Sequence, residues 1–151
     1  MGPTTKTITV TGGITFDQLM ASYRAQAIGL LKGGADVLLL GTAQDTRNVK
    51  AAVIAIREAF LQAGLRVPLM ISATIEPMGT MLAGQPIAAF YAWVGHAEMA
   101  SIGLNCATGP EFMADHLRTL NTLASCAISC YPNAGLPDEN GRYSESPAMI
   151  A

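Results

Sequence analysis

The sequence predicts an α/β protein that forms part of a TIM-type (β/α)8 barrel, about four consecutive strand–helix units long. Apolar runs of strand length alternate with segments of helical periodicity, and the strands begin about 25 to 35 residues apart, a normal repeat for this unit. The pattern begins and ends within a unit. Because four units cannot close a barrel, we expect residues 1–151 to form a single partial barrel domain, truncated at both ends.

An open parallel βα sheet is the alternative architecture, because the same repeat builds both folds. Open sheets of this kind often bind nucleotides through a Gly-x-Gly-x-x-Gly loop or a phosphate-loop lysine. The sequence contains neither motif, so the barrel is favoured.

Continuous apolar runs mark the predicted strands, as is typical of parallel strands covered on both faces. The four predicted strands are residues 37–40, 69–74, 102–106 and 126–131. A shorter β-prone run covers residues 7–11 and ends at two glycines.

Helices are predicted from apolar residues at spacings of three and four. The first helix follows the capping residue Thr15 and ends at Gly33, and Asp45 caps the second. Pro86 and Pro110 open the next two helices, because proline is tolerated in a first turn. The helical segments cover residues 16–31, 49–60, 87–94 and 112–120, and a further helix begins at 147.

The composition limits the kinds of partner that the protein can have. The formal net charge is -2, so no basic surface predicts nucleic-acid binding. Charged residues make up 13% of the chain, against about 25% in typical domains, and apolar residues reach 50%. We therefore expect the rest of a larger fold to cover part of the surface, or the chain to self-associate.

The cysteines and the uncharged segments bear on the compartment. An odd number of cysteines, three, with no signal peptide, favours a reduced, cytoplasmic setting. Residues 77–97 carry no charge when His96 is neutral, but glycines and a proline interrupt them. A membrane-spanning helix needs about 20 predominantly apolar residues, so we expect no membrane span.

Residues 101–110 have the layout of a functional site. A short strand ends at Asn105 and Cys106, a turn follows, and Pro110 and Glu111 open a helix. Functional residues of parallel α/β proteins gather where strands end, so the pattern indicates a site at this edge. A cysteine after an apolar run is also typical of a small buried hydrophobe, and spacing alone does not separate the two interpretations.

The most specific features are five stretches spread over the whole chain. They are Gly-Pro-Thr-Thr-Lys at 2–6, Gly-Gly-Ala-Asp-Val-Leu-Leu at 33–39, Gln-Asp-Thr-Arg-Asn-Val-Lys-Ala-Ala at 44–52, Gly-Thr-Met-Leu-Ala-Gly-Gln at 79–85, and the pair Gly-Leu-Asn-Cys at 103–106 with Tyr-Pro-Asn-Ala-Gly-Leu-Pro at 131–137. Together and in this order they resemble the homocysteine-binding barrel of cobalamin-dependent methionine synthase. The resemblance implies a fragment of a zinc-dependent homocysteine S-methyltransferase domain.

The resemblance implies that Cys106 is one of three zinc-binding thiolates. In the family the other two form a Gly-Gly-Cys-Cys-Gly motif at the end of the eighth strand, and this chain does not contain that motif. Cys126 and Cys130 do not replace it, because strand alternation sends both to one face, where we expect packed thiols. The zinc site of this chain is therefore incomplete, and we expect the chain alone to be inactive.

The family chemistry explains why thiolates are needed. A free thiol has a pKa of ~8.5, so little thiolate exists at neutral pH, whereas a coordinating metal deprotonates the thiol. A catalytic zinc keeps a fourth position for substrate, and homocysteine sulfur would fill it before accepting a methyl group from methylcobalamin to give methionine. Methylcobalamin and methyltetrahydrofolate are bound by other domains in the full-length family. We expect those domains and the missing half of the barrel as partners.

Gly41 marks a departure from the family. A Glu-Thr pair commonly follows the corresponding strand there, and its glutamate is expected to hold the substrate ammonium group, whereas this sequence has Gly41 and Thr42. By resemblance Gly41, Thr42 and Asn105 are assigned to substrate binding, and no residue is assigned a catalytic role. Glu76 follows the next strand and offers another carboxylate, although it is also interpretable as an ordinary loop acid.

Three functions are compatible with these features. The first is a piece of the methyltransferase, favoured by the presence of Asn105 and Cys106. The second is a catalytically inactive half-barrel that serves as a structural or small-molecule-binding module, favoured by the missing carboxylate at Gly41. The third is a small-molecule-binding module built on an open sheet.

Overall fold

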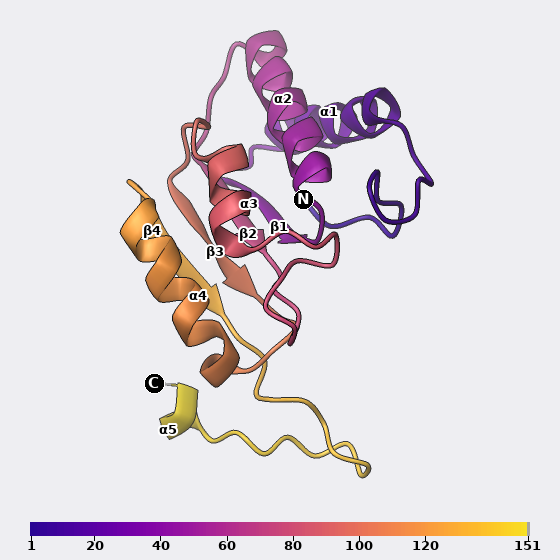
Figure 1. Cartoon of the computed structure of the whole chain (residues 1–151). Helices are drawn as coiled ribbons and strands as arrows, with labels where there is room; N and C mark the ends of the chain where they lie inside the picture. The colour runs from indigo at the N-terminus through magenta and orange to yellow at the C-terminus, as the bar shows by residue number, and fades with distance from the viewer. Residues whose placement is uncertain (151) are drawn as a thin grey trace.

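A parallel four-stranded sheet forms the centre of the protein, and the computed structural model describes residues 1–150 (Figure 1). Its strands are β1 (Leu38–Ala43), β2 (Leu69–Ala73), β3 (Ser101–Asn105) and β4 (Ala127–Tyr131). Each strand pairs with the next in the chain, so the spatial order is β1-β2-β3-β4. Barrel walls have this sequential order, whereas doubly wound open sheets reverse it at a switch point. The topology therefore agrees with a partial barrel.

Five helices are described along the chain within residues 1–150. They are α1 (Phe16–Lys32), α2 (Thr46–Ala63), α3 (Ile87–Val94), α4 (Pro110–Leu123) and α5 (Pro147–Ile150). Because crossovers between parallel strands are right-handed, the connecting helices α2, α3 and α4 cover the same face of the sheet. Helix α1 packs against α2, and the chain after β4 extends away from the sheet before it reaches α5 (Figure 1).

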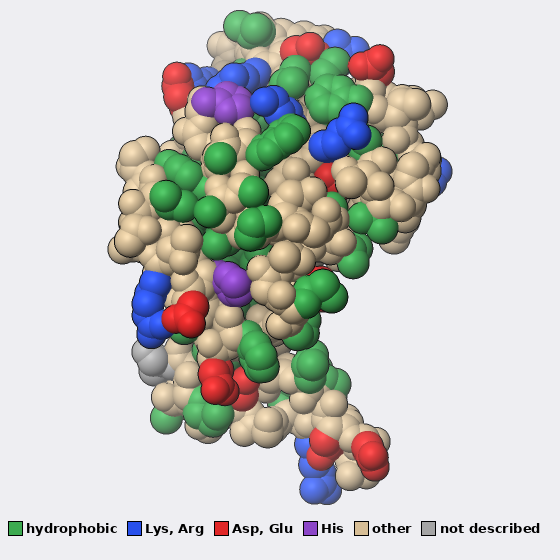
Figure 2. All heavy atoms as spheres, in the orientation of Figure 1, with side chains coloured by type: hydrophobic (Ala, Val, Ile, Leu, Met, Phe, Trp, Pro, Cys, Tyr) green, Lys and Arg blue, Asp and Glu red, His purple; other side chains and the backbone are tan. Residues whose placement is uncertain are grey.

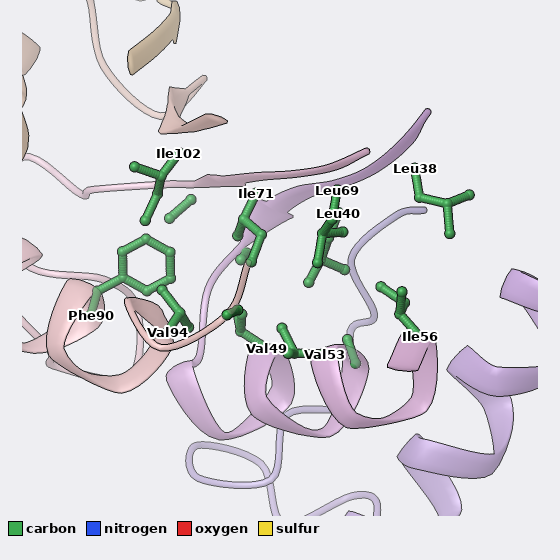
Figure 3. Close-up of a cluster of buried hydrophobic side chains, with 14 of the residues drawn as sticks. Leu38, Leu40, Val49, Val53, Ile56, Leu69, Ile71, Phe90, Val94 and Ile102 are labelled. Carbon is green, nitrogen blue, oxygen red and sulfur yellow. The ribbon is translucent and has the colours of Figure 1, made fainter. Parts of the chain in front are cut away.

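The hydrophobic core lies between the sheet and these connecting helices. Leu40, Ile71 and Ile102 point from three neighbouring strands toward Val53 of α2 and Phe90 of α3 (Figure 3). Ile71, Ile102 and Phe90 are completely buried. Burying a side chain of this size stabilises the fold by about 1.5–3 kcal/mol, so this layer holds the helices on the sheet.

The opposite face of the sheet is less well covered than the sequence predicts. The central strand β3 is buried throughout, as expected for a strand covered on both faces. In β1, however, Leu39 is 39% exposed, and in β4 Tyr131 is 53% exposed. The expectation of two-sided burial is therefore wrong for the outer strands, because no strand of the described chain faces them across a barrel interior.

The predicted β-prone run at residues 7–11 is wrong, because residues 8–11 form a turn. The hydroxyl of Thr7 accepts hydrogen bonds from the backbone N–H groups of Val10 and Thr11, at 3.1 and 3.0 Å. The hydroxyl of Thr11 in turn donates to the Thr7 carbonyl at 3.0 Å. Threonine side chains compete with a strand ladder in this way when they find local backbone partners.

The predicted helix starts are confirmed. Thr15 caps α1 in a reciprocal arrangement with Gln18, and Asp45 caps α2 by accepting from the Arg47 backbone N–H. Helix α4 begins at Pro110, as the tolerance of proline in a first turn predicts.

The uncharged stretch around residues 77–97 contains only the eight residues of α3 as helix, and within residues 1–150 no helix is both long and apolar enough to cross a bilayer.

The N-terminal residue covers part of the free edge of β1. The Met1 amine donates to the Leu39 carbonyl at 2.6 Å, and the Gly41 N–H donates to the Met1 carbonyl at 3.0 Å. These two bonds occupy part of the β1 edge. On the face shown in Figure 2, broad areas carry no charged side chain.

Asp45 joins the turn near the N-terminus to α2, and we predict that Asp45→Ala lowers the free energy of unfolding by about 2–4 kcal/mol. Its completely buried carboxylate accepts from the Arg47 N–H at 2.8 Å, the Thr9 N–H at 2.8 Å and the Thr9 hydroxyl at 3.1 Å. Urea denaturation measures the change. Asp17→Ala, in the exposed first turn of α1, is the control, and an equal loss in both variants would contradict the prediction.

We predict that the chain self-associates through its open sheet. Unpaired strand edges and exposed apolar side chains on a strand invite pairing with another chain. Sedimentation velocity at several concentrations should show a concentration-dependent increase in mass. Leu39→Lys on β1 should weaken the association, whereas Leu61→Lys, on an exposed position of α2, should not. A monomer at the highest concentrations would show that the sheet is self-contained.

Candidate functional site

The carboxyl ends of three neighbouring strands bring together the polar residues of the candidate site. Thr42 lies near the end of β1, Ser72 near the end of β2, and Asn105 at the end of β3, with Cys106 directly after it. Parallel pairing places these ends at one edge of the sheet. Asn105, Thr42 and Cys106, which the sequence assigned to a site, therefore lie together.

The side-chain amide of Asn105 connects the three strands. Its oxygen accepts from the Thr42 backbone N–H at 3.2 Å and from the Ser72 hydroxyl at 2.6 Å. Its nitrogen donates to the Thr42 hydroxyl at 3.0 Å and to the Cys106 sulfur at 3.0 Å. Asn105 is buried, and its bond to the Ser72 hydroxyl is shielded from competing water, whereas the bonds to Thr42 and Cys106 are partly buried.

A bulge in β1 aims Thr42 at Asn105. The pairing with β2 shifts register between Leu40 and Ala43, and Thr42 has a φ of 56°. A left-handed backbone is uncommon for a branched residue and costs on the order of 1–3 kcal/mol. The bulge turns both the N–H and the hydroxyl of Thr42 to the Asn105 amide, which helps to hold this conformation.

Cys106 is exposed and sits on a left-handed turn that β4 holds in place. Cys106 and Ala107 have φ values of 56° and 59°. The Cys106 N–H donates to the Tyr131 carbonyl at 3.0 Å, and the Asn133 N–H donates to the Thr108 carbonyl at 3.1 Å. The two most specific stretches of the sequence, 103–106 and 131–137, are thus neighbours in space.

Gly41 has room for a side chain. Its φ is not in the left-handed region, and a Cβ atom there would meet the Leu39 side chain at 3.9 Å, an ordinary van der Waals distance. Pro3 and Thr4 line the same small pocket as Gly41 and Thr42, so the predicted stretch 2–6 borders the site. The absence of a carboxylate at residue 41 is therefore not imposed by crowding.

The other two cysteines do not join Cys106. The expectation of a packed thiol is wrong for Cys130, which is exposed because β4 is an outer strand. Its sulfur lies 3.9 Å from that of Met113, a buried residue of α4, and partial burial raises the pKa of the Cys130 thiol. Cys126 is half-buried and packs against the core. Among residues 1–150, no three His, Cys, Asp or Glu side chains cluster as a metal site would need. The described residues therefore do not by themselves form a complete zinc site.

Glu76 lies in the loop after β2 and is half-buried. Its backbone N–H donates to the Thr80 carbonyl at 2.8 Å, and its carbonyl accepts from the Gly79 N–H at 2.8 Å. These bonds shape the loop and do not connect Glu76 to Gly41. A substrate role for Glu76 stays a prediction.

Ser72 is the site residue that the sequence analysis missed. It is almost completely buried and provides the shortest bond to the Asn105 amide. Its only signal is that it is a hydroxyl residue within residues 69–73, which are otherwise apolar. A buried polar side chain needs a partner, which makes such a residue a candidate for a structural or functional contact.

A cavity of about 660 Å³ lies at the other edge of the sheet. It is lined mainly by apolar residues of α2 and by Leu69, the first residue of β2, with Ala97 and Glu98 before β3. Functional sites of parallel barrels lie at the carboxyl ends of the strands, whereas the residues at the opposite end usually contribute to stability. We therefore place the candidate site at Asn105 and Cys106 and not in this larger cavity.

Comparison with solved structures defines the class of fold. The homocysteine methyltransferase MmuM of Escherichia coli superposes in its apo form with a TM-score of 0.70 at 21% identity, covering 87% of this chain and 46% of that protein. Its metallated form gives a TM-score of 0.68 at 23% identity, covering 81% of this chain and 41% of that protein. The fold is thus that of slightly less than half of a barrel enzyme.

Sequence comparison then places the chain in a family. The family model described as homocysteine S-methyltransferase matches residues 1–151. The methionine synthase of Mycobacterium leprae (strain TN) is 44% identical over 147 residues, which is 97% of this chain and 12% of that protein. The chain belongs to the homocysteine S-methyltransferase family, and it spans about an eighth of the length of this relative.

We predict that the isolated chain binds zinc weakly, with a dissociation constant above the micromolar range. A catalytic zinc takes three protein ligands and a structural zinc four, and no three candidate ligands cluster among residues 1–150. Competition with a colorimetric chelator measures the affinity. Cys106→Ser and the control Cys130→Ser should both leave it unchanged. Stoichiometric submicromolar binding that Cys106→Ser abolishes would show that residues of this chain complete a site.

Proposed function

We propose that this chain is the part of a homocysteine S-methyltransferase barrel that supplies one zinc-binding thiolate and a wall of the homocysteine site. The observation that carries the proposal is the joining of Thr42, Asn105 and Cys106 at the carboxyl edge of the sheet. Membership of the family and the name of the methionine synthase relative support the same substrate. The fold of MmuM, which has a metallated form, supports a metal in the completed barrel.

Each residue has a defined task in this proposal. The Asn105 N–H holds the Cys106 sulfur in place at the rim of the barrel. Cys106 donates its thiolate to the metal, and two further thiolates come from the part of the barrel that this chain lacks. Zinc, when bound, would supply a homocysteine sulfur that is deprotonated at neutral pH. The Gly41 and Thr42 backbone forms the wall beside the substrate.

The methyl donor belongs to the rest of the protein in this proposal. Methylcobalamin and methyltetrahydrofolate would bind in other domains, and the completed barrel would present the homocysteine sulfur to the methyl group. The relative extends far beyond the region that this chain matches, which leaves room for those domains. We place the whole protein in the cytoplasm.

A second candidate function is a half-barrel that binds without catalysing. The observation that favours it is Gly41, because the residue at that position provides no carboxylate for the substrate ammonium group. Such a chain would keep the packing of the fold and the position of Cys106 but would hold homocysteine in a poorly defined orientation.

Reconstitution tests the proposal against this alternative. The chain would be co-expressed with the complementary part of a family barrel that carries the paired cysteines. One zinc per reconstituted barrel, lost in Cys106→Ser but kept in Cys130→Ser, supports the proposed ligand role. Transfer of a methyl group from methylcobalamin to homocysteine would then support the enzyme, and zinc binding without methyl transfer would support the inactive half-barrel.

We predict that Gly41→Glu raises kcat/KM for homocysteine in the reconstituted barrel by about one to two powers of ten. A hydrogen bond to a charged group is worth about 1.5–3 kcal/mol, and misplacing the sulfur by about 1 Å costs on the order of a hundredfold. The open space at Gly41 admits the side chain.

Gly41→Gln is the matched control for this prediction, because it has a similar size without the charge. Zinc affinity should be the same in the original chain and in both variants, since the metal needs only the thiolates. Equal kcat/KM values would mean that another group, with Glu76 as the first to test, already holds the ammonium group.

A further inference from the structure

We propose that Ser72 and Thr42 are positioning residues that hold the Asn105 amide with its N–H group on the Cys106 sulfur. The proposal deepens the proposed function, because the importance of that sulfur rests on its role as a metal ligand. The geometry itself is a property of this chain, and it is therefore testable without substrate, metal or the other half of the barrel.

The hydrogen-bonding capacity of Asn105 is fully used. An asparagine side chain has two N–H donors and two acceptor lone pairs on its oxygen. In Asn105 both donors and both acceptors have partners, which come from Thr42, Ser72 and Cys106. Aspartate has a similar shape but no N–H group, so it would lose the bond to sulfur and place a charge beside it.

The backbone N–H of Thr42 decides which way the amide faces. This group can only donate a hydrogen bond, so it pairs with the amide oxygen and not with the amide NH2. A hydroxyl donates or accepts and would tolerate either orientation. The left-handed φ of 56° at Thr42 aims the N–H at the amide. The β1 bulge thus selects the orientation that directs an N–H to Cys106.

Ser72 holds the selected orientation from the side of β2. Its hydroxyl lies 2.6 Å from the amide oxygen, and Ser72 is 1% exposed. Without this hydroxyl the oxygen would keep a single donor in a buried environment. The amide would then tilt toward Thr42 and away from sulfur. The Cys106 sulfur would then lose the N–H group that Asn105 directs to it.

The test compares Ser72→Ala with Ser101→Ala in the 151-residue chain. Ser101 is a matched control, because it is also a buried strand serine and its hydroxyl has no hydrogen-bond partner. The rate at which the Asn105 side-chain NH2 protons exchange with solvent is measured by NMR in both variants at one fixed pH. Ser72→Ala should speed this exchange by about three- to tenfold, and Ser101→Ala should change it by less than about 1.5-fold.

The Asn105 side-chain NH2 also gives a readout in the unmodified chain. In the unmodified chain both of its protons are bonded, so they should exchange with solvent at least about tenfold more slowly than those of exposed Asn140. This measurement needs no variant and keeps the proposal testable if Ser72→Ala does not fold. Ser72→Ala should shift the Asn105 signals, and Ser72→Thr, which retains the hydroxyl, should restore them.

Three results would overturn the proposal. They are equal exchange at Asn105 and Asn140, unchanged Asn105 signals in Ser72→Ala, and an Asn105 exchange rate that Ser101→Ala raises as much as Ser72→Ala does. Neither readout involves homocysteine or zinc. A reconstituted barrel that fails to transfer methyl groups would therefore refute the proposed function without affecting these measurements, and the reverse also holds.

Discussion

The sequential, parallel pairing of four strands is the constraint on which the rest of the structure depends. It brings the carboxyl end of every strand to one edge, so that Thr42 and Asn105, 63 positions apart, become hydrogen-bond partners. Because the crossovers between the strands are right-handed, the connecting helices lie on one face of the sheet, and the core lies between these helices and the sheet. They also leave the other face of the outer strands open. The site and the exposed sheet therefore have a common cause.

Backbone strain is concentrated at the edge that carries the candidate site. Thr42, Cys106 and Ala107 are the non-glycine residues with positive φ among residues 1–150. Strained conformations persist where surrounding contacts over-determine them, and here the contacts are the Asn105 amide and the β4 backbone. The strain places two polar groups of Thr42 and the thiol of Cys106 around a single amide. This concentration is what distinguishes the edge from an ordinary set of loops.

The candidate site consists of two parts that differ in how complete they are. The sulfur part, Asn105 with Cys106, has every hydrogen bond of its amide in place. The part that the resemblance assigns to the ammonium group has Gly41, with space but no charge. A metal ligand and a substrate-orienting carboxylate contribute separately to catalysis, because the first activates the nucleophile and the second aligns it. In the proposed function, metal binding and the orientation of homocysteine are therefore separable.

The sequence by itself determined the order of strands and helices, because apolar periodicity and helix caps such as Asp45 act over a few residues. It also located Asn105 and Cys106 at a strand end. It failed at residues 8–11, where threonine hydroxyls found local partners. Only the tertiary structure decided that Ser72 belongs to the site and that Leu39 is exposed. The physical reason is that the contacts of Ser72 and the exposure of Leu39 both depend on which strands lie beside their own. The local sequence of a strand does not specify its neighbours.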